Sequence, residues 1–284
     1  ETCLNEPYGD MWHHLSRLCY KVHPYQWPTI GREMKHISEA TLDYVESFFY
    51  NYYRPDNAVI VLAGNISTDY GLSLVQKWFG DIPSGEHYIR YLPQEPVQTT
   101  PRKLEVHANV PVDAFYKCWH ICSRTDRRYY ATDLLTEVLS GGGSSRLFQS
   151  LVKEKQLFSN IGCYHFGSID AGLAAIEGKL VKGVKMEEAE SAVEAELQKI
   201  KNTLVEEKEL RKVKNKTESL ITFEDMSLMN RAGSLSFCSL LGNTNMINEE
   251  LERYQGVSAA ELRQEAEIIF DPNNSVTMYY FGNH

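Results

Sequence analysis

Residues 258–282 read SAAELRQEAEIIFDPNNSVTMYYFG, and this stretch decides the fold of the chain. Ser258 and Glu261 have the spacing of a capping box, in which each side chain bonds a backbone N–H at the start of a helix. Pro272 ends that helix because its ring leaves no N–H to donate. The apolar run after it is too short and too rich in β-prone residues for a second helix. The stretch therefore predicts a helix, a proline–asparagine turn and a strand.

The same order of elements occurs once earlier, in residues 38–64, SEATLDYVESFFYNYYRPDNAVIVLAG. Here a helix is expected to open at Ser38 and to end at Pro55, and residues 58–63 are expected to form a strand. The two prolines, Pro55 and Pro272, are 217 positions apart. A near-match at so long an offset indicates duplication of a whole domain rather than a solenoid. We therefore expect two copies of one fold, each with the helix, the turn and the strand.

Chain length and composition bound the class of protein. At 284 residues the chain suits two domains, and 43% hydrophobic with 24% charged residues is typical of a globular protein. The net charge is -9 and the basic residues are scattered, which argues against nucleic acid as a partner. Apolar runs fall far short of the ~20 residues that span a bilayer, so no membrane partner is expected. Six unevenly spaced cysteines, at positions 3, 19, 118, 122, 163 and 238, indicate reduced thiols and a cytoplasmic location.

The domain boundaries follow from a proline-rich stretch. Residues 92–101, LPQEPVQTTP, contain few large apolar side chains, so we place a linker at residues 93–101. Residues 102–284 then mix strands with helices and form a complete α+β unit of antiparallel sheet packed with helices. Residues 1–92 show only the last part of the earlier copy, and the sequence begins at Glu1 rather than at a methionine. We therefore expect the opening strands of the first copy to lie upstream.

A hydrolytic zinc site needs at least three ligands and an open position for water, and two of the ligands are often histidines one helical turn apart. The sequence has no such pair. The nearest match is His36 with Glu39, where Ala40 occupies the position of the second histidine. His13 and His14 are adjacent and point about 100° apart on a helix, so they cannot share a metal. We therefore predict no catalytic residue and no zinc ligand set in this chain.

One alternative for a metal site lies on two expected strands. Cys118, His120 and Cys122 alternate onto one face of a strand, and Cys163 and His165 do so on another. A zinc site of thiolates and imidazoles would be possible if those strands paired in register. Buried cysteine is common in protein cores, however. We favour a layer of the sheet core, with each histidine bonded to a hydroxyl or carbonyl group.

Three consecutive glycines form the candidate binding segment. Gly141, Gly142 and Gly143 tolerate positive φ and let the backbone come close to a bound peptide, and Ser144 follows them. The G-x-S-x-G nucleophile motif and the lysine of a phosphate-binding loop are both absent, which argues against those two chemistries. A turn between two helices after Leu139 is the other interpretation, and both stay open. We take the three glycines and the serine as candidate substrate-binding residues.

Several short motifs of this chain are each weak evidence by themselves, but their order and spacing are informative. They are PYG (7–9), HPY (23–25), TIG (29–31), YYRPDN (52–57), GNI (64–66), WFGDIP (78–83) and LSGGGSSRLF (139–148). With this order and spacing the chain resembles the pitrilysin/insulinase-type zinc metallopeptidases, in particular the branch of the mitochondrial processing peptidase and its small bacterial relatives. The resemblance covers nearly the whole chain.

The resemblance implies a fold and a role for each half. In that family each half is an α/β roll, two halves form one lobe, and the first half holds zinc through two histidines and a glutamate. Those ligands would precede Glu1, so the chain would comprise the end of the zinc-bearing half and the complete non-catalytic half. Zinc is therefore expected in the parent protein and not in this chain, which alone should be inactive.

A further departure concerns transition-state stabilisation. Many members of the family carry an arginine, followed by a tyrosine, that hold the substrate backbone and the developing oxyanion. The matching positions here are Val152 and Ser159, which cannot donate charge in that way. The resemblance then implies that such donors come from a partner lobe.

The implied function is that of a fragment of a zinc metalloendopeptidase, which cleaves peptides enclosed between the two lobes of a homo- or heterodimer. This chain would supply scaffold and substrate-chamber surface. The alternative is a non-catalytic assembly subunit, because core subunits of respiratory complexes share the fold. The negatively charged chain without a membrane-docking segment favours the peptidase.

Overall fold

The computed structural model describes residues 6–29, 31, 33–85 and 89–283. Cys3, one of the six cysteines, and Ile30, within the TIG motif, lie outside these residues. Contacts divide the chain into two compact units. The sheet unit comprises Glu1–Pro28, Pro93–Thr217 and Glu252–His284, and the helical unit comprises Thr29–Leu92 and Glu218–Leu251.

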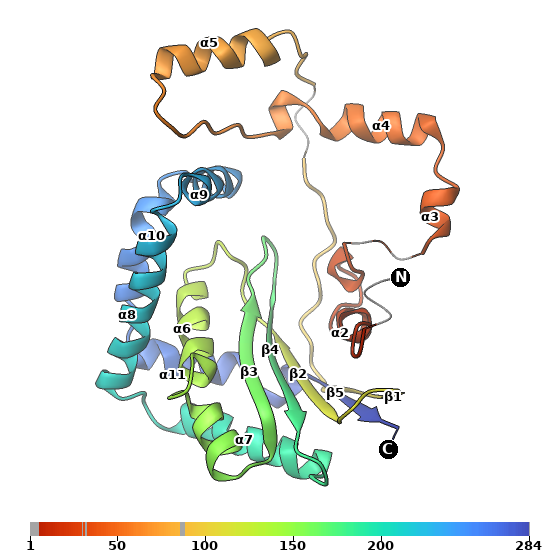
Figure 1. Ribbon diagram of the computed structural model, residues 1–284, viewed down its shortest axis with the longest axis vertical. Helices are drawn as coiled ribbons and strands as arrows, with labels where there is room; N and C mark the ends of the chain where they lie inside the picture. Colours follow the sequence, from red (N-terminus) through yellow and green to blue (C-terminus); the bar gives the residue numbers. More distant parts are fainter. Residues whose placement is uncertain (1–5, 30, 32, 86–88, 284) are drawn as a thin grey trace. The chain divides into compact units, whose positions relative to one another are not determined.

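The sheet unit is built on one sheet, which has five strands within the described residues (Figure 1). The strands are β1 (Arg102–Ala108), β2 (Ala114–His120), β3 (Phe158–Phe166), β4 (Leu173–Leu180) and β5 (Ser275–Gly282). Their spatial order is β1-β5-β2-β4-β3, so the last strand of the sequence lies between β1 and β2. β1 and β5 are parallel, and the other pairs are antiparallel. The expected α+β class, with a mainly antiparallel sheet and packed helices, is confirmed.

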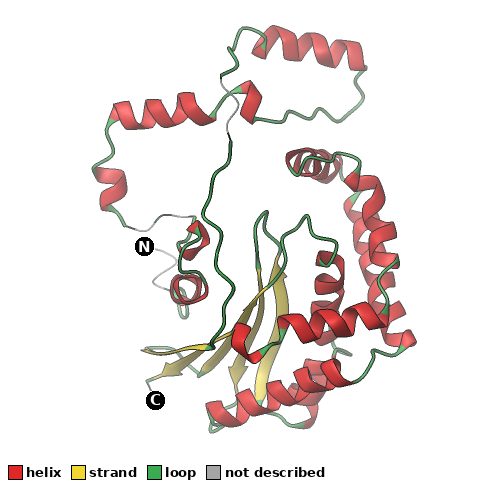
Figure 2. Ribbon diagram, turned by 180° about the vertical axis from the view of Figure 1, so that it is seen from behind, coloured by secondary structure: helices red, strands yellow, loops and turns green. Residues whose placement is uncertain are grey.

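Helices cover both faces of this sheet (Figure 2). One face packs against α2 (Met11–Cys19), and the other against α6 (Tyr129–Ser140) and α7 (Met186–Asn202). α11 (Ala259–Ile269) packs against both α6 and α7. Along β2, Tyr116 and Cys118 belong to the core beneath α2, whereas Lys117 bonds Glu190 of α7 at 2.8 Å. Successive side chains of a strand point to opposite faces. Both faces of the central strands are therefore buried.

The C-terminal stretch folds as its local signals predict. Ser258 and Glu261 form a capping box at the start of α11. Pro272 begins a short 3-10 helix, η4 (Pro272–Asn274), and β5 follows directly. The predicted helix, turn and strand are thus confirmed.

The earlier copy matches the later one in its helix and turn but not in its strand. Thr41 caps α4 (Leu42–Tyr52), so the helix begins later than its serine signal predicted. A 3-10 helix that starts with proline, η2 (Pro55–Asn57), follows it, as η4 does in the later copy. Within the described chain, residues 58–63 form no strand, and that prediction is wrong. A strand exists only where a neighbouring strand takes its backbone hydrogen bonds, and the described residues supply no such neighbour here.

The remaining elements complete the two units. The sheet unit also contains η1 (Pro24–Gln26) and a π-helix, η3 (Phe148–Glu154), and the helical unit contains α3 (Lys35–Ser38), α5 (Thr68–Phe79) and α9 (Leu228–Leu240). Residues of α8 (Glu207–Glu224) and α10 (Met246–Gln255) belong partly to each unit. Residues 203–206 are not helical and separate α7 from α8.

The helical unit leaves much of its apolar surface uncovered. Tyr50 of α4 is 67% exposed and Trp78 of α5 is 68% exposed, although both helices have one apolar side. None of the helices in the described ranges is long and apolar enough to cross a membrane. The described residues of this unit therefore do not bury their own apolar face.

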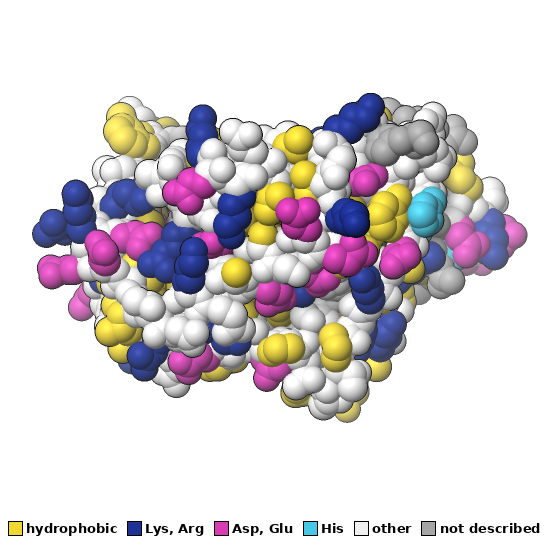
Figure 3. Space-filling view, turned by 90° about the horizontal axis from the view of Figure 1, so that it is seen from below, with side chains coloured by type: hydrophobic (Ala, Val, Ile, Leu, Met, Phe, Trp, Pro, Cys, Tyr) yellow, Lys and Arg dark blue, Asp and Glu magenta, His cyan; other side chains and the backbone are white. Residues whose placement is uncertain are grey.

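Charge is spread rather than grouped on the face of the molecule seen from below. Figure 3 shows basic and acidic side chains interspersed there with scattered apolar ones. This distribution agrees with the moderate net charge of -9. On that face, no large patch of one sign offers a nucleic-acid footprint.

Candidate functional site

The three glycines form an exposed turn directly after α6. Gly141 ends the helix by donating its N–H to the Glu137 carbonyl oxygen at 2.7 Å, and the Ser145 N–H closes the turn on the Gly142 carbonyl oxygen at 3.0 Å. The three residues between Gly141 and Ser145 are exposed. The structure therefore places all four candidate substrate-binding residues on one turn with a solvent-facing edge. We call residues 141–144 the glycine turn.

The three glycines of this turn differ in what constrains them. Gly142 has φ +113°, a region that L side chains rarely adopt, and no atom lies within 4 Å of an added Cβ. Gly141 lies so close to Glu137 that an added Cβ would clash with its side chain and backbone. Gly143 has neither constraint, because its φ is not positive and a Cβ would meet open space. Only Gly142 therefore needs glycine for its backbone conformation.

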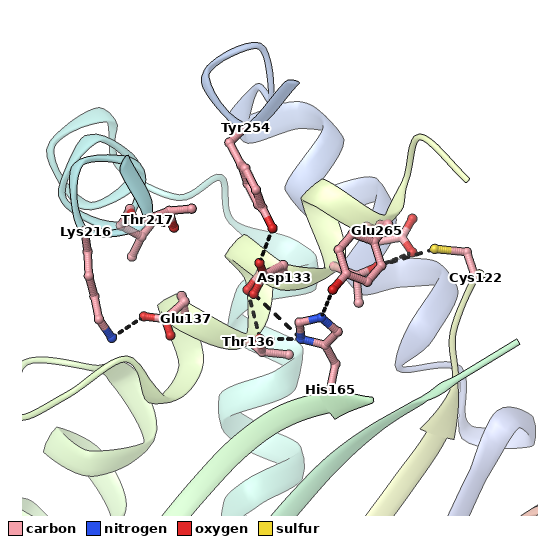
Figure 4. A network of polar contacts seen from close by, with 12 residues as sticks. Cys122, Asp133, Thr136, Glu137, His165, Lys216, Thr217, Tyr254 and Glu265 are labelled. Atoms are coloured by element: carbon pink, nitrogen blue, oxygen red, sulfur yellow. Dashed lines mark hydrogen bonds and ion pairs between the residues drawn. The ribbon is translucent and has the colours of Figure 1, made fainter. Parts of the chain in front are cut away.

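Two lysines of α8 hold the glycine turn in place. The Lys216 ammonium donates to a carboxylate oxygen of Glu137, as Figure 4 shows, and lies 3.4 Å from the Gly141 carbonyl oxygen. One turn earlier in the helix, the Lys212 ammonium donates to Ser144 Oγ at 3.1 Å. Residues four apart lie on one side of a helix. The two ammonium groups therefore brace both ends of the turn.

The residues that follow the turn are also anchored. Arg146 makes a bidentate ion pair with Glu209 of α8, with Nη2 2.7 Å from Oε2 and Nε 3.1 Å from Oε1. Gln149 donates a hydrogen bond to the Gly143 carbonyl oxygen. Sequence reasoning did not find the α8 side chains, because they come from a helix more than sixty residues further along the chain. The spacing of Glu209, Lys212 and Lys216 on one helical face was the available signal.

Two backbone donors on this braced turn are open to a ligand. The N–H groups of Gly143 and Ser144 make no hydrogen bond within the described part of the chain. Both residues are exposed, so water solvates these groups in the free protein. The backbone of an extended peptide presents carbonyl oxygens that accept hydrogen bonds. The two N–H groups are therefore available to acceptors from outside the turn.

The positions matched to the arginine and tyrosine of the family lie beyond the glycine turn. Val152 is half-buried in η3, and the exposed Ser159 donates to the Lys179 carbonyl oxygen at 3.1 Å. Neither carries a charge or a phenol. These two positions supply no strong donor for an oxyanion.

The thiols and imidazoles considered for zinc do not come together. Cys118 pairs with Ala175 of β4, whereas Cys163 pairs with the next residue of that strand, Ile176. Adjacent residues point to opposite faces, so Cys118 lies beneath α2 and Cys163 lies on the other face. The zinc alternative for Cys118, His120, Cys122, Cys163 and His165 is therefore wrong. The cysteines are buried as expected, but Cys118 and Cys163 lie on two faces of the sheet, so the prediction of one layer is wrong. The buried Nε2 of His120 has no hydrogen-bond partner among the described residues, contrary to the expected hydroxyl or carbonyl partner.

The chemical state of these groups agrees with a core role. A hydrogen bond with Cys19, together with burial, raises the pKa of the Cys118 thiol, and burial raises the pKa of Cys122 to about 11. Zinc binds the thiolate form, which these environments disfavour. Burial also lowers the pKa of His120. In the part of the chain that the structure describes, no three histidine, cysteine or acidic side chains are grouped to hold a metal.

The other histidines weighed for a metal lie elsewhere. His36 is exposed in the short helix α3. His14 lies 3.1 Å from Asp10, one helical turn earlier in the chain. These contacts fit surface residues.

His165 takes part in a polar network that joins β3 to α6 and α10 (Figure 4). Its Nε2 lies 3.0 Å from the Tyr129 hydroxyl, and its Nδ1 lies 3.7 Å from an oxygen of Asp133. The Tyr254 hydroxyl donates to the other oxygen of Asp133. Burial lowers the pKa of His165, and the Asp133 carboxylate opposes that shift. The network holds the end of β3 against α6. The expected hydroxyl partner of His165 is the Tyr129 side chain.

Comparison with known proteins places the chain among zinc-protease relatives. The family described as "Peptidase M16 inactive domain" matches residues 39–217. The uncharacterized zinc protease YmxG of Bacillus subtilis is 25% identical over 274 residues, covering 93% of this chain and 63% of that protein. The zinc protease PqqE of Helicobacter pylori is 24% identical over 280 residues, covering 97% of this chain and 62% of that protein. The chain thus spans less than two thirds of the length of these relatives.

The fold agrees with that of a solved relative. The crystal structure of a protease from Helicobacter pylori superposes with a TM-score of 0.90 at 23% sequence identity, and the match covers 98% of this chain and 68% of that chain. At this identity the likeness establishes the fold alone.

Proposed function

The chain belongs to the Peptidase M16 inactive domain family, and on that premise we propose that it is the larger part of one lobe of a zinc endopeptidase. In this proposal residues 1–92 are the end of the zinc-bearing half, residues 93–101 are the linker, and residues 102–284 are the complete non-catalytic half. Support comes from the zinc-protease relatives and from the single sheet with helices on both faces. A second lobe, in a homo- or heterodimer, would close the chamber around the substrate.

In this proposal the chain holds the peptide, and the glycine turn is the segment that binds it. The supporting observation is the pair of exposed N–H groups of Gly143 and Ser144, presented on a turn that Lys212 and Lys216 brace. Donors fixed before binding lose little conformational freedom when a peptide arrives. The turn would therefore position the peptide backbone for cleavage elsewhere in the chamber.

Zinc belongs to the parent protein in this proposal. The candidate donors on the described strands do not fit the metal, because the strand cysteines lie on opposite faces of the sheet and burial favours their protonated thiols. Attack of water on the peptide bond would then depend on ligands outside these 284 residues. Metal analysis of the dialysed chain should find zinc well below one per chain, and one tightly bound zinc would contradict the proposal.

The assembly-subunit alternative is not favoured. The curated relatives are named zinc proteases, and the glycine turn offers backbone donors that a purely structural role does not need. We further propose a bacterial, cytoplasmic protein, since the two relatives described above are bacterial and the cysteines Cys19, Cys118, Cys122, Cys163 and Cys238 are free thiols.

Peptide binding by two valine variants tests the proposal. Gly142→Val should weaken the binding of a labelled, unstructured peptide, measured by fluorescence anisotropy, by about tenfold, because two hydrogen bonds of about 0.5–1.5 kcal/mol each are disturbed. Gly183→Val is the matched control. Gly183 also has positive φ, +90°, and open space around an added Cβ, but it lies in the turn between β4 and α7. Equal affinities of the two variants would contradict peptide binding at the glycine turn.

A further inference from the structure

A cavity of about 640 Å³ lies in the sheet unit, between the start of α6, the end of α10 and the start of α11. Its charged lining residues are three arginines and three acids, namely Arg127, Arg128, Arg253, Glu252, Glu261 and Glu265. Sites for small ligands usually measure about 300–1,000 Å³. No residue of the glycine turn or of the His165–Asp133 pair lines it. The cavity is therefore a second place on this unit where a ligand fits.

Glu265 is the buried acid of this cavity, with a side chain only 3% exposed. The Thr132 hydroxyl donates to it at 3.0 Å, and the Arg128 guanidinium lies 4.0 Å away, beyond a hydrogen bond. Burial raises the pKa of Glu265, and Arg128 and Thr132 only partly oppose that shift. An ionised carboxylate can accept about four hydrogen bonds. The described residues use only part of this accepting capacity, through the one hydrogen bond from Thr132.

Two other acids of the same unit show what a well-paired carboxylate looks like. Glu196, 4% exposed, accepts from Lys199 at 2.8 Å and from Ser150 at 2.6 Å. Glu190 accepts from Lys117 at 2.8 Å. For both acids burial raises the pKa, but these hydrogen bonds outweigh it and the pKa is lowered. Glu265 differs from both because no cation among the described residues lies at hydrogen-bond distance from it.

We propose that this cavity binds a short peptide or amino acid as a zwitterion, with the ligand ammonium against Glu265 and the ligand carboxylate against the arginines of the rim. An ammonium group supplies up to three donors, which is what the buried carboxylate lacks. At the rim, Arg127 is 85% exposed and lies 3.4 Å from Glu261. Such an exposed pair is weak and yields readily to a second carboxylate.

The choice of a peptide rather than another zwitterion rests on the proposed function. Hydrolysis of a peptide bond leaves a new ammonium on one product and a new carboxylate on the other. Short products therefore carry both charges that the cavity can pair. In this view the non-catalytic half holds products away from the glycine turn.

Isothermal titration calorimetry with three related ligands tests the pairing on the unmodified chain. Glycyl-leucine should bind with a Kd on the order of 1 mM or below. N-acetyl-glycyl-leucine, which lacks the ammonium, and glycyl-leucinamide, which lacks the carboxylate, should each bind at least about tenfold more weakly. Binding of a capped dipeptide as tight as that of glycyl-leucine would overturn the proposal, and so would no binding of glycyl-leucine at 10 mM, about ten times that Kd.

Variants locate the ligand in the cavity. Glu265→Gln and Arg127→Ala should each weaken glycyl-leucine binding several-fold, with the fold checked by circular dichroism. Arg263→Ala is the matched control, because Arg263 lies on α11 outside the cavity, 3.6 Å from Glu267. Unchanged affinity in both cavity variants would place the dipeptide elsewhere and overturn the proposal. Long-peptide binding that responds to Gly142→Val but not to Glu265→Gln would leave the glycine turn intact, so the two proposals fail separately.

Discussion

Replacing Gly142 by alanine should destabilise the protein, whereas the same change at Gly143 should not. Gly142 has φ +113°, and no atom lies within 4 Å of an added Cβ, so the cost is backbone strain without a clash. Strain of this kind costs about 1–3 kcal/mol. Alanine also restricts the unfolded chain, which stabilises the folded state by about 0.4–1 kcal/mol. We therefore expect a net loss of about 1–2 kcal/mol.

At Gly143 only the second effect operates, because its φ is not positive and a Cβ would meet open space. Gly143→Ala should leave stability unchanged or raise it by up to about 1 kcal/mol. Urea denaturation followed by circular dichroism measures both variants, and a thermal melt should separate their midpoints by several degrees, at about 2–4 °C per kcal/mol. Equal midpoints, or a larger loss at Gly143, would refute the assignment of the backbone constraint to Gly142.

Three further predictions concern the sheet unit. Gly178→Ala should lower stability by about 1–3 kcal/mol in urea denaturation, because the new Cβ would lie 2.5 Å from the Phe158 ring, and normal stability would contradict this packing. Lys117→Met should cost about 2 kcal/mol of stability, because it leaves Glu190 without its cation. Burial raises the pKa of Glu190, but hydrogen bonds lower that pKa overall. The wild type should therefore lose stability as pH falls below 4.5, and the variant should lose less. Burial lowers the pKa of His165, so its neutral form stabilises the fold above pH 6.5 and that contribution should fade as pH falls through the lowered pKa; an unchanged acid profile in His165→Gln would contradict this.

Local signals in the sequence predicted local structure well. The capping box at Ser258 and the proline at position 272 depend on neighbours within a few residues, and both elements form where expected. Residues 58–63 carry an equally clear strand pattern, yet a strand also needs a partner that the pattern cannot supply. Prediction therefore failed where the deciding hydrogen bonds are not local.

The candidate sites show the same difference between features set by local sequence and features set by distant partners. The glycine turn could be found because three consecutive glycines are visible in the sequence. The zinc alternative failed because strand register decides which face a side chain takes, and a shift of one residue separates Cys118 from Cys163. The braces from Lys212 and Lys216 could not be assigned, since their partners are distant along the chain.

Hydrogen exchange in the presence of a peptide tests the central claim most directly, namely that the glycine turn of a non-catalytic half holds substrate. The measurement follows the amides of Gly143 and Ser144 in the wild-type chain and in Gly142→Val, with and without an unstructured peptide in excess. We expect the peptide to slow exchange of both amides in the wild type, to have little effect in the variant, and to remain uncleaved. Unchanged exchange at these amides in the wild type, or cleavage of the peptide by the chain alone, would contradict the account.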